Sequence, residues 1–275
     1  MPKVWFITGA SKGFGRIWAE AALARGDQVA ATARDPRTLD DLVDRYGDNV
    51  LAHRLDVTDK ATVDAVVNKA HERFGRLDVV VNNAGYGLFG TIEEVSEDQA
   101  RAQIETNLFG ALWVTKAALP ILREQGSGHI IQVSSIGGVN AFPTVGLYHA
   151  SKWGLEGFSQ SLAQEVAEFG IKVTLVEPVG FSTDWAGPSG VRADRLPAYA
   201  EVWKRREEMR ANAPVGDPEA TGPAILELVD AENPPLRVFF GDWPLEAIKA
   251  EYGKRIAEWE AWNDLAVRAF GGVPA

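Results

Sequence analysis

The sequence contains no cysteine, only four histidines and few positive charges. Without cysteine there can be no disulfides, thiolate nucleophiles or cysteine-based zinc and iron–sulfur sites. The histidines show no metal-ligand spacing, so we expect no metal. With 28 Lys+Arg against 38 Asp+Glu, the formal net charge is −10, which disfavours nucleic acid or an anionic membrane as a partner. No uncharged apolar run reaches the ~20 residues that a membrane span needs.

Length and composition favour a globular protein. The 275 residues are 46% hydrophobic and 24% charged, which is typical of a chain that buries a full core and excludes disordered, collagen-like and low-complexity classes. The apolar start, residues 3–9, is too short and too soon interrupted by glycine for a signal peptide. We therefore expect a cytoplasmic protein.

Short apolar runs alternate with amphipathic stretches along the first two thirds of the chain. Strands that are nearly continuously apolar, with helical patterns between them, indicate a parallel sheet covered by helices on both faces. We predict an α/β fold: a single doubly wound Rossmann-type domain over 1–275, with seven parallel strands in the order 3-2-1-4-5-6-7. The predicted strands are Val4–Thr8, Gln28–Ala33, Val50–Asp56, Leu77–Asn82, His129–Ser134, Ile171–Glu177 and Leu236–Gly241.

Two segments depart from this alternation. Residues 181–213, after the sixth predicted strand, carry Gly, Pro, aromatics and a charged cluster, and we interpret them as an inserted segment that covers the substrate. The tail from Trp243 has a helical pattern that includes Trp259 and Trp262, which we assign to core or subunit packing.

A glycine-rich turn joins the first strand to the first helix, with the sequence Gly9-Ala10-Ser11-Lys12-Gly13-Phe14-Gly15. Glycines here allow a tight turn and a close approach of backbone to a pyrophosphate, which the start of a helix attracts. The spacing is G-x-x-x-G-x-G, and no Gly-Lys-Ser/Thr follows, which disfavours a nucleoside triphosphatase.

With this turn in place, the chain resembles the short-chain dehydrogenase/reductase family in its shorter, non-extended branch. Further matches are Asp56-Val57, Asn82-Asn83-Ala84-Gly85, and a catalytic tetrad at Asn107, Ser135, Tyr148 and Lys152. The resemblance covers roughly residues 3–185 and the strand near Val238. It implies hydride transfer between a nicotinamide cofactor and a carbonyl or alcohol. It also implies a cofactor site of Gly9, Ser11, Lys12, Gly13, Phe14, Gly15, Arg34, Asp56, Val57, Asn83, Ala84, Gly85, Tyr148, Lys152, Pro178, Phe181 and Thr183.

The residues of the tetrad have a physical rationale of their own. Tyr148 and Lys152 are four apart, so they share a helix face, and a nearby cation lowers the pKa of a phenol from about 10 toward the range of an acid/base catalyst. Ser135 ends a strand, where its hydroxyl can stabilise charge on a substrate carbonyl oxygen. Asn107 lies within a helix, a poor place for Asn unless its side chain is used.

Cofactor choice is predicted from the end of the second strand. Ala33 stands where family members that prefer NAD place an acid, and Arg34 follows it. With Lys12 in the glycine turn, two cations would converge on a ribose 2′-phosphate. We predict NADP(H) in preference to NAD(H), although Asp35 also follows the strand.

The substrate site is predicted around Ser135, Tyr148, Val179 and Trp185. The family usually has Pro-Gly after the sixth strand, where this chain has Pro178-Val179. Val179 either packs into the sheet or narrows the pocket opposite Trp185, Tyr199 and Trp203, which favours an apolar or aryl ketone.

Other candidates are weaker. We assign His149 to packing. Glu93 and Glu94, which are adjacent in the sequence, are assigned to a solvated helix start. Alternative functions are a non-catalytic dinucleotide sensor and an epimerase or dehydratase of the extended branch. The intact tetrad disfavours the sensor.

Apolar residues on the helices around 97–125 and 148–169 lead us to expect a homodimer or homotetramer. The resemblance implies the same, since the family forms such assemblies through equivalent helices.

Overall fold

The computed structural model describes residues 2–187 and 189–273, in two compact units, Met1–Phe240 and Gly241–Ala275. The second unit consists of α9 (Pro244–Ala261) and α10 (Asn263–Ala269). Trp259 and Trp262 are 66% and 64% exposed, which excludes packing in the core, and their packing between subunits stays a prediction. The single domain was predicted over 1–275, and the first of the two units contains the whole main sheet and every predicted site residue.

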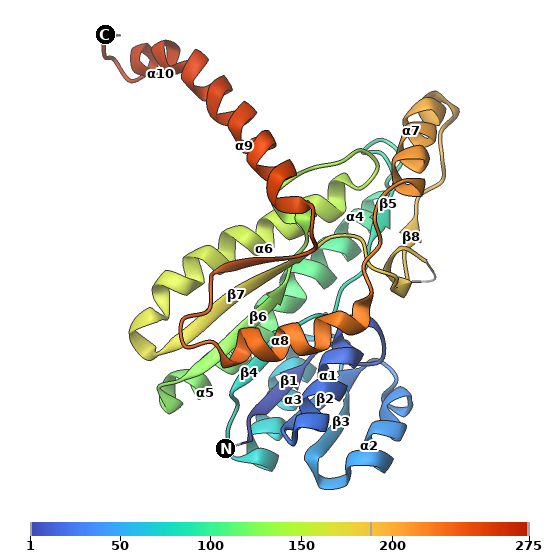
Figure 1. Ribbon diagram of the computed structural model, residues 1–275, viewed down its shortest axis with the longest axis vertical. Coiled ribbons are helices and arrows are strands. Elements are labelled where there is room, and N and C mark those ends of the chain that lie inside the picture. Colours follow the sequence, from blue (N-terminus) through green and yellow to red (C-terminus); the bar gives the residue numbers. More distant parts are fainter. Residues whose placement is uncertain (1, 188, 274–275) are drawn as a thin grey trace. The chain divides into compact units, whose positions relative to one another are not determined.

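Seven parallel strands form the main sheet in the order β3-β2-β1-β4-β6-β7-β9 (Figure 1). Counted along the chain, these strands have the order 3-2-1-4-5-6-7, which confirms the predicted topology. Their bounds are β1 (Val4–Ile7), β2 (Gln28–Ala33), β3 (Val50–Arg54), β4 (Val79–Asn82), β6 (Gly128–Val133), β7 (Ile171–Pro178) and β9 (Arg237–Phe240).

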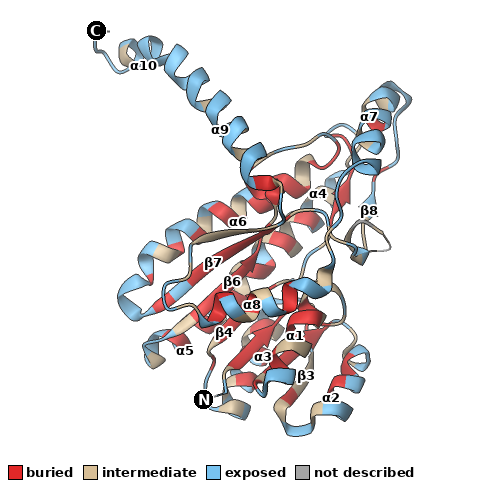
Figure 2. Cartoon of the chain, in the orientation of Figure 1, coloured by how far each residue is buried: buried red, intermediate tan, exposed pale blue. Residues whose placement is uncertain are grey.

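Both faces of the sheet are covered, which explains the nearly continuous apolar strands. In β1, Trp5 and Ile7 belong to one hydrophobic cluster, while Val4 and Phe6 belong to another on the opposite face. Figure 2 shows the buried strands between partly exposed helices. The first cluster is covered by α1 (Gly13–Arg25), α2 (Asp40–Tyr46) and α8 (Thr221–Asp230), and the second by α3 (Lys60–Phe74), α5 (Gly110–Gln125) and α6 (Gly146–Glu165).

The long helix expected around 97–125 is divided. It consists of α4 (Glu97–Ile104), a π-helical turn over Glu105–Phe109, and α5. A capping box between Ser96 and Gln99 starts α4. The helix expected from Tyr148 starts two residues earlier, at Gly146, and a short 3₁₀ turn follows it to Gly170. The π-helical turn carries Asn107 and therefore positions a predicted site residue.

The segment over residues 181–213 is joined to the rest of the first unit by a second, two-stranded sheet. There β8 (Val191–Arg192) pairs with β5 (Leu88–Phe89), and α7 (Ala200–Ala211) follows. Sequence analysis missed both strands because two residues carry no periodicity.

Glu93 and Glu94 hold this segment in place, which overturns their assignment to a solvated helix start. The Glu94 carboxylate accepts hydrogen bonds from Leu196 N at 2.9 Å and from Trp203 Nε1 at 3.0 Å. Glu93 accepts one from the Tyr199 hydroxyl at 2.6 Å. The partners lie about a hundred residues along the chain, which neighbouring sequence cannot show.

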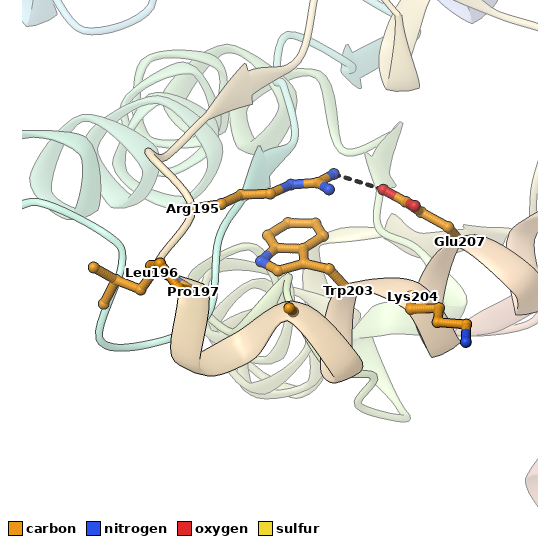
Figure 3. Close-up of a pocket in the computed structure, with 7 residues that line it drawn as sticks. Arg195, Leu196, Pro197, Trp203, Lys204 and Glu207 are labelled. Carbon is orange, nitrogen blue, oxygen red and sulfur yellow. Dashed lines mark ion pairs between the residues drawn. The ribbon is translucent and has the colours of Figure 1, made fainter.

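The outer part of the segment contains a cavity of about 260 Å³ (Figure 3). The Arg195 guanidinium lies over the Trp203 ring, 4.0 Å from its centroid, and pairs with Glu207 at 2.8 Å. The lining residues all belong to 195–207, so this cavity contains no predicted catalytic residue.

Candidate active site

The glycine turn lies between β1 and α1 and has the backbone that only glycine adopts readily. Gly9 and Gly13 have φ values of +67° and +57°. A Cβ at Gly15 would lie 2.5 Å from the Gly9 carbonyl oxygen, so a side chain there would displace backbone. No side chain caps the start of α1, and its first turn contains no acid. The unpaired N–H groups of this helix start therefore suit a phosphate anion, and the turn fits a dinucleotide.

Asn83 stabilises the glycine turn through hydrogen bonds of its side chain. Its side-chain amide donates to the carbonyl oxygens of Thr8 and Gly9 at 2.9 and 3.0 Å. The Thr8 hydroxyl accepts from the backbone N–H groups of Asn83 and Ala84. The next residue, Gly85, lies against Asn107, whose Oδ1 would be 3.1 Å from an added Cβ. The motif over 82–85 thus joins the glycine turn to the Asn107 helix.

The predicted ribose end of the site contains Arg34, which is exposed and makes no hydrogen bond or ion pair with another described residue. Asp35 is bonded to Arg37, whose guanidinium donates at 2.9 and 2.8 Å and lowers the pKa of that carboxyl. Lys12 points to the covering segment, 3.3 Å from Asp184. Lys12 and Arg34 were expected to lie together at the ribose, but the contact that Lys12 makes here is with Asp184.

The remaining predicted cofactor residues lie along one rim. Asp56 accepts from Thr58, and Val57 is buried against Gly110. Phe14 stacks on Trp18 at 5.5 Å and meets Phe181 edge-on at 5.1 Å. This aromatic contact brings the glycine turn beside the chain that follows β7. Pro178 ends β7, and Phe181 and Thr183 follow it, while Ser11 lies on the glycine turn.

Tyr148, Lys152 and Ser135 are brought together by α6 and the end of β6. Lys152 Nζ lies 5.8 Å from the centroid of the Tyr148 ring and donates to the Val133 carbonyl oxygen at 2.7 Å. Ser135 follows β6, and its Oγ accepts from Gly137 N at 3.0 Å. Tyr148 and Lys152 are both buried.

Burial dominates the proton affinities of this group. It raises the pKa of Tyr148 to about 12, while a hydrogen bond with Ser135 acts in the opposite direction. It lowers the pKa of Lys152 to about 8, opposed by the charge of Glu156. Burial therefore has the largest effect on the pKa of Tyr148, and the hydrogen bond with Ser135 opposes it; the lowering of this pKa by Lys152 stays a prediction.

Asn107 uses every part of its side-chain amide. Its Nδ2 donates to the Tyr86 carbonyl oxygen at 2.9 Å and to Ser151 Oγ at 3.3 Å, and its Oδ1 accepts from Tyr86 N at 3.1 Å. This confirms that an Asn at this place in a helix is used. Its partners lie on the loop after β4 and on α6, so Asn107 fixes the loop against the helix of Tyr148.

Aromatic side chains surround Tyr148. The Trp185 ring lies 4.9 Å from it, and Phe89 meets Trp185 at 5.4 Å. Val179 is half-buried, donates its N–H to the Phe240 carbonyl oxygen at 3.1 Å and joins none of the hydrophobic clusters among the described residues. Packing into the sheet core is thereby excluded for Val179.

His149 has the structural role that the sequence predicts. Its Nδ1 lies 2.9 Å from the Gly137 carbonyl oxygen, and its Nε2 accepts from Phe142 N at 2.9 Å. Both ring nitrogens are thus used within the protein.

Sequence analysis missed a pair of buried carboxyl groups behind Lys152. Glu156 and Glu177 are 5% and 1% exposed, and Arg237 pairs with Glu156 at 2.8 Å and lies 3.6 Å from Glu177. Burial, reinforced by the charge of Glu156, raises the pKa of Glu177 to about 8. The sequence does contain a signal, since Glu177 is an acid that directly follows the apolar residues Leu175 and Val176 of a predicted buried strand.

Comparison with known proteins decides the family. The sequence model of the short chain dehydrogenase family matches residues 3–192. The chain belongs to the short-chain dehydrogenase family. Oxidoreductase BOA17 of Botryotinia fuckeliana is 45% identical over 271 residues, which are 97% of this chain and 99% of that protein. A short-chain dehydrogenase from Streptomyces avermitilis superposes with a TM-score of 0.91 at 41% identity, covering 98% of each chain.

Two further solved relatives of this oxidoreductase contain nicotinamide dinucleotides. An alcohol dehydrogenase from Thermococcus sibiricus, in complex with 5-hydroxy-NADP, has a TM-score of 0.74 and 27% identity, covering 87% of this chain and 96% of its own. A short chain dehydrogenase/reductase from Burkholderia phymatum, in complex with NAD, has a TM-score of 0.79 and 26% identity, covering 94% and 95%. Within the described residues, no helix is long and apolar enough to cross a membrane.

Proposed function

We propose that this protein is an NADP(H)-dependent oxidoreductase that reversibly reduces a ketone or aldehyde to an alcohol, with an apolar or aryl ketone as substrate. The observation that carries the proposal is the placement of Tyr148 beside Ser135 and Lys152, under an aromatic wall that includes Trp185. The glycine turn and the uncapped start of α1 support a dinucleotide site. Related structures that hold NADP or NAD support the same cofactor class.

In the proposed reaction, the reduced nicotinamide supplies, when bound, the hydride that adds to the carbonyl carbon. Ser135 donates a hydrogen bond to the carbonyl oxygen and holds it beside the phenol. As the C=O π bond breaks, Tyr148 transfers its hydroxyl proton to that oxygen, which yields the alcohol and a tyrosinate. Lys152, four residues along α6, stabilises the tyrosinate until a proton from solvent restores the phenol.

The high pKa of Tyr148 suits the reducing direction. With a value of about 12, the phenol keeps its proton at neutral pH and is available as an acid. Removing only that hydroxyl in Tyr148→Phe should lower kcat for ketone reduction by about 10²–10⁴-fold, the usual contribution of general acid catalysis. NADPH oxidation with a panel of aryl ketones measures this. A variant that keeps more than about a tenth of the activity would show that Tyr148 is not the acid.

The preference for NADP(H) is supported by the neutral Ala33 and the unpaired Arg34 at the end of β2. Asp35, the acid that could instead bind ribose hydroxyls, is bonded to Arg37. Arg34→Ala should therefore lower kcat/KM for NADPH much more than for NADH. An unchanged ratio between the two cofactors would refute the preference.

A homodimer or homotetramer through α4, α5 and α6 completes the proposal. Several of the apolar residues that suggested it, including Leu122, Leu155 and Leu162, are buried in the protein's own core. The stacked pair Phe109 and Trp113, 5.9 Å apart, stays partly exposed and supports a contact there. Sedimentation that gives only monomer at micromolar concentration would contradict this part.

A further inference from the structure

The wall around Tyr148 extends to two phenylalanines. Phe89 contacts Trp185, which lies on Tyr148, and Phe142 lies 5.7 Å from His149, the neighbour of Tyr148. These rings come from β5, the loop before α6 and the covering segment. They form one hydrophobic cluster with Tyr148.

Two arginines of α7 lie over the far rings of this wall. The Arg206 guanidinium is 5.7 Å from the centroid of Phe142, and that of Arg210 is 5.9 Å from the centroid of Phe89. The two residues are four apart and share one face of α7. That face of the helix therefore looks onto the cluster that contains Tyr148.

Neither guanidinium makes a hydrogen bond or an ion pair with a described residue. Arg206 is half-buried, and its Nε has no hydrogen-bond partner. Burial and the charge of Arg210 both lower the pKa of Arg206. Like charges four apart destabilise a helix, and a desolvated guanidinium without a partner is costly.

Within the described part of the chain, no carboxylate pairs with Arg206 or Arg210. Asp and Glu outnumber Lys and Arg by 38 to 28, and Arg195 in the same segment is paired with Glu207. A ligand anion would supply the missing charge and hydrogen-bond acceptors, for which the guanidinium fork is well suited.

We propose that Arg206 and Arg210 bind an anionic oxygen group, a carboxylate or a phosphate, carried by the ketone substrate whose carbonyl lies at Tyr148. The apolar body of the substrate lies between Trp185, Phe89 and Phe142. This inference rests on the proposed function and specifies its substrate class: an apolar or aryl ketone with a negatively charged end.

The test compares three ketones of one shape with NADPH as reductant: para-acetylbenzamide, para-acetylbenzoate and para-acetylphenyl phosphate. We expect kcat/KM to be about tenfold or more higher for at least one anion than for the neutral amide, as charge-assisted hydrogen bonds are stronger than neutral ones. The larger of the two anion effects identifies carboxylate or phosphate as the group. Arg206→Gln and Arg210→Gln should each reduce the anion-to-amide ratio several-fold.

Arg205→Gln is the matched control, with the same charge change on the same helix. Arg205 lines a separate groove with Val202 and Met209, so the ratio should keep its wild-type value. Calorimetric Kd values of the benzoate and the benzamide for the protein–NADPH complex give a second readout that needs no turnover. Melting temperatures of all variants check folding.

The outcomes separate the two proposals. Reduction of the amide and both anions with equal kcat/KM and equal Kd would overturn the anion site and leave the ketone reductase in place. An equal fall of the ratio in Arg205→Gln would also overturn the site, since it would show a general effect of charge. Tight binding of an anion without reduction of any ketone would support the site and overturn the proposed reaction.

Discussion

Replacing Glu177 by Gln should remove a pH dependence of stability that the buried carboxyl pair creates. The group is 1% exposed, lies on β7 beside Glu156, and has a pKa of about 8, compared with an ordinary value of 4.5. Between these values the folded protein holds a proton that the unfolded chain releases. Stability from this proton is complete below about pH 4.5 and is lost as the pH rises through about 8.

The slope of this effect is about 1.4 kcal/mol per pH unit for one proton. Between about pH 5.5 and 7.5 the wild-type protein should therefore lose up to about 2.7 kcal/mol that a glutamine would not lose. Arg237 and Glu156 share the site, so part of the proton uptake is divided among them, and this figure is the upper end. For a chain of this size, each kcal/mol of stability changes the melting temperature by about 2–4 °C. The difference in melting temperature between the variant and the wild type should therefore change by roughly 5–10 °C across this pH range.

The assay is thermal and urea unfolding of the wild-type protein and Glu177→Gln across this pH range. The melting temperature of the variant minus that of the wild type should increase steadily with pH. Glu168→Gln, at an exposed acid after α6, is the control, and its difference from the wild type should stay nearly constant. Parallel curves for wild type and Glu177→Gln would refute the shared buried proton.

Three further predictions concern the covering segment, the pocket and the cofactor turn. The Glu94 carboxylate accepts hydrogen bonds from Leu196 N and Trp203 Nε1, and Glu94→Gln removes its charge and one acceptor oxygen. Limited proteolysis should therefore cut residues 190–213 faster in this variant, and equal rates would contradict the anchoring role. Val179→Gly should accept bulkier aryl ketones or change the enantiomeric ratio of the alcohol, at nearly constant NADPH affinity. Unchanged selectivity across a panel of ketones would show that Val179 does not line the pocket. Gly15→Ala places a Cβ 2.5 Å from the Gly9 carbonyl oxygen and should weaken NADPH binding more than tenfold by fluorescence titration, an expectation that fails if the Kd stays at its wild-type value.

The sheet could be predicted almost to the residue, because its strands are buried on both faces and form nearly continuous apolar runs. Predicted Gln28–Ala33 is β2 itself, and predicted His129–Ser134 differs from β6 by one residue at each end. The short pair β5–β8 could not be predicted, since its two residues per strand owe their conformation to pairing between distant segments. The division at Phe240 is likewise a property of tertiary contacts rather than of composition.

Around the site, spacing predicted which residues meet but not their energetics. Tyr148 and Lys152 share a face of α6 as their spacing requires. The pKa of Tyr148 nevertheless rises to about 12, because the depth of burial depends on rings such as Trp185 that come from elsewhere. The same limit applies to Glu94, because its partners Leu196 and Trp203 lie far from it along the sequence.

The helix that carries Tyr148 and Lys152 continues the same spacing to Glu156, so three ionisable groups follow one another at intervals of four residues. The charge of Glu156 opposes the effect of burial on Lys152, and Arg237 in turn holds Glu156. Glu177 retains a proton to about pH 8, which keeps a second negative charge out of this buried group. At neutral pH the cluster behind Lys152 therefore contains one carboxylate paired with one guanidinium. Glu156 on α6 thus favours the cationic form of Lys152 beside Tyr148, while Arg237 on β9 and Glu177 on β7 set the charge around Glu156.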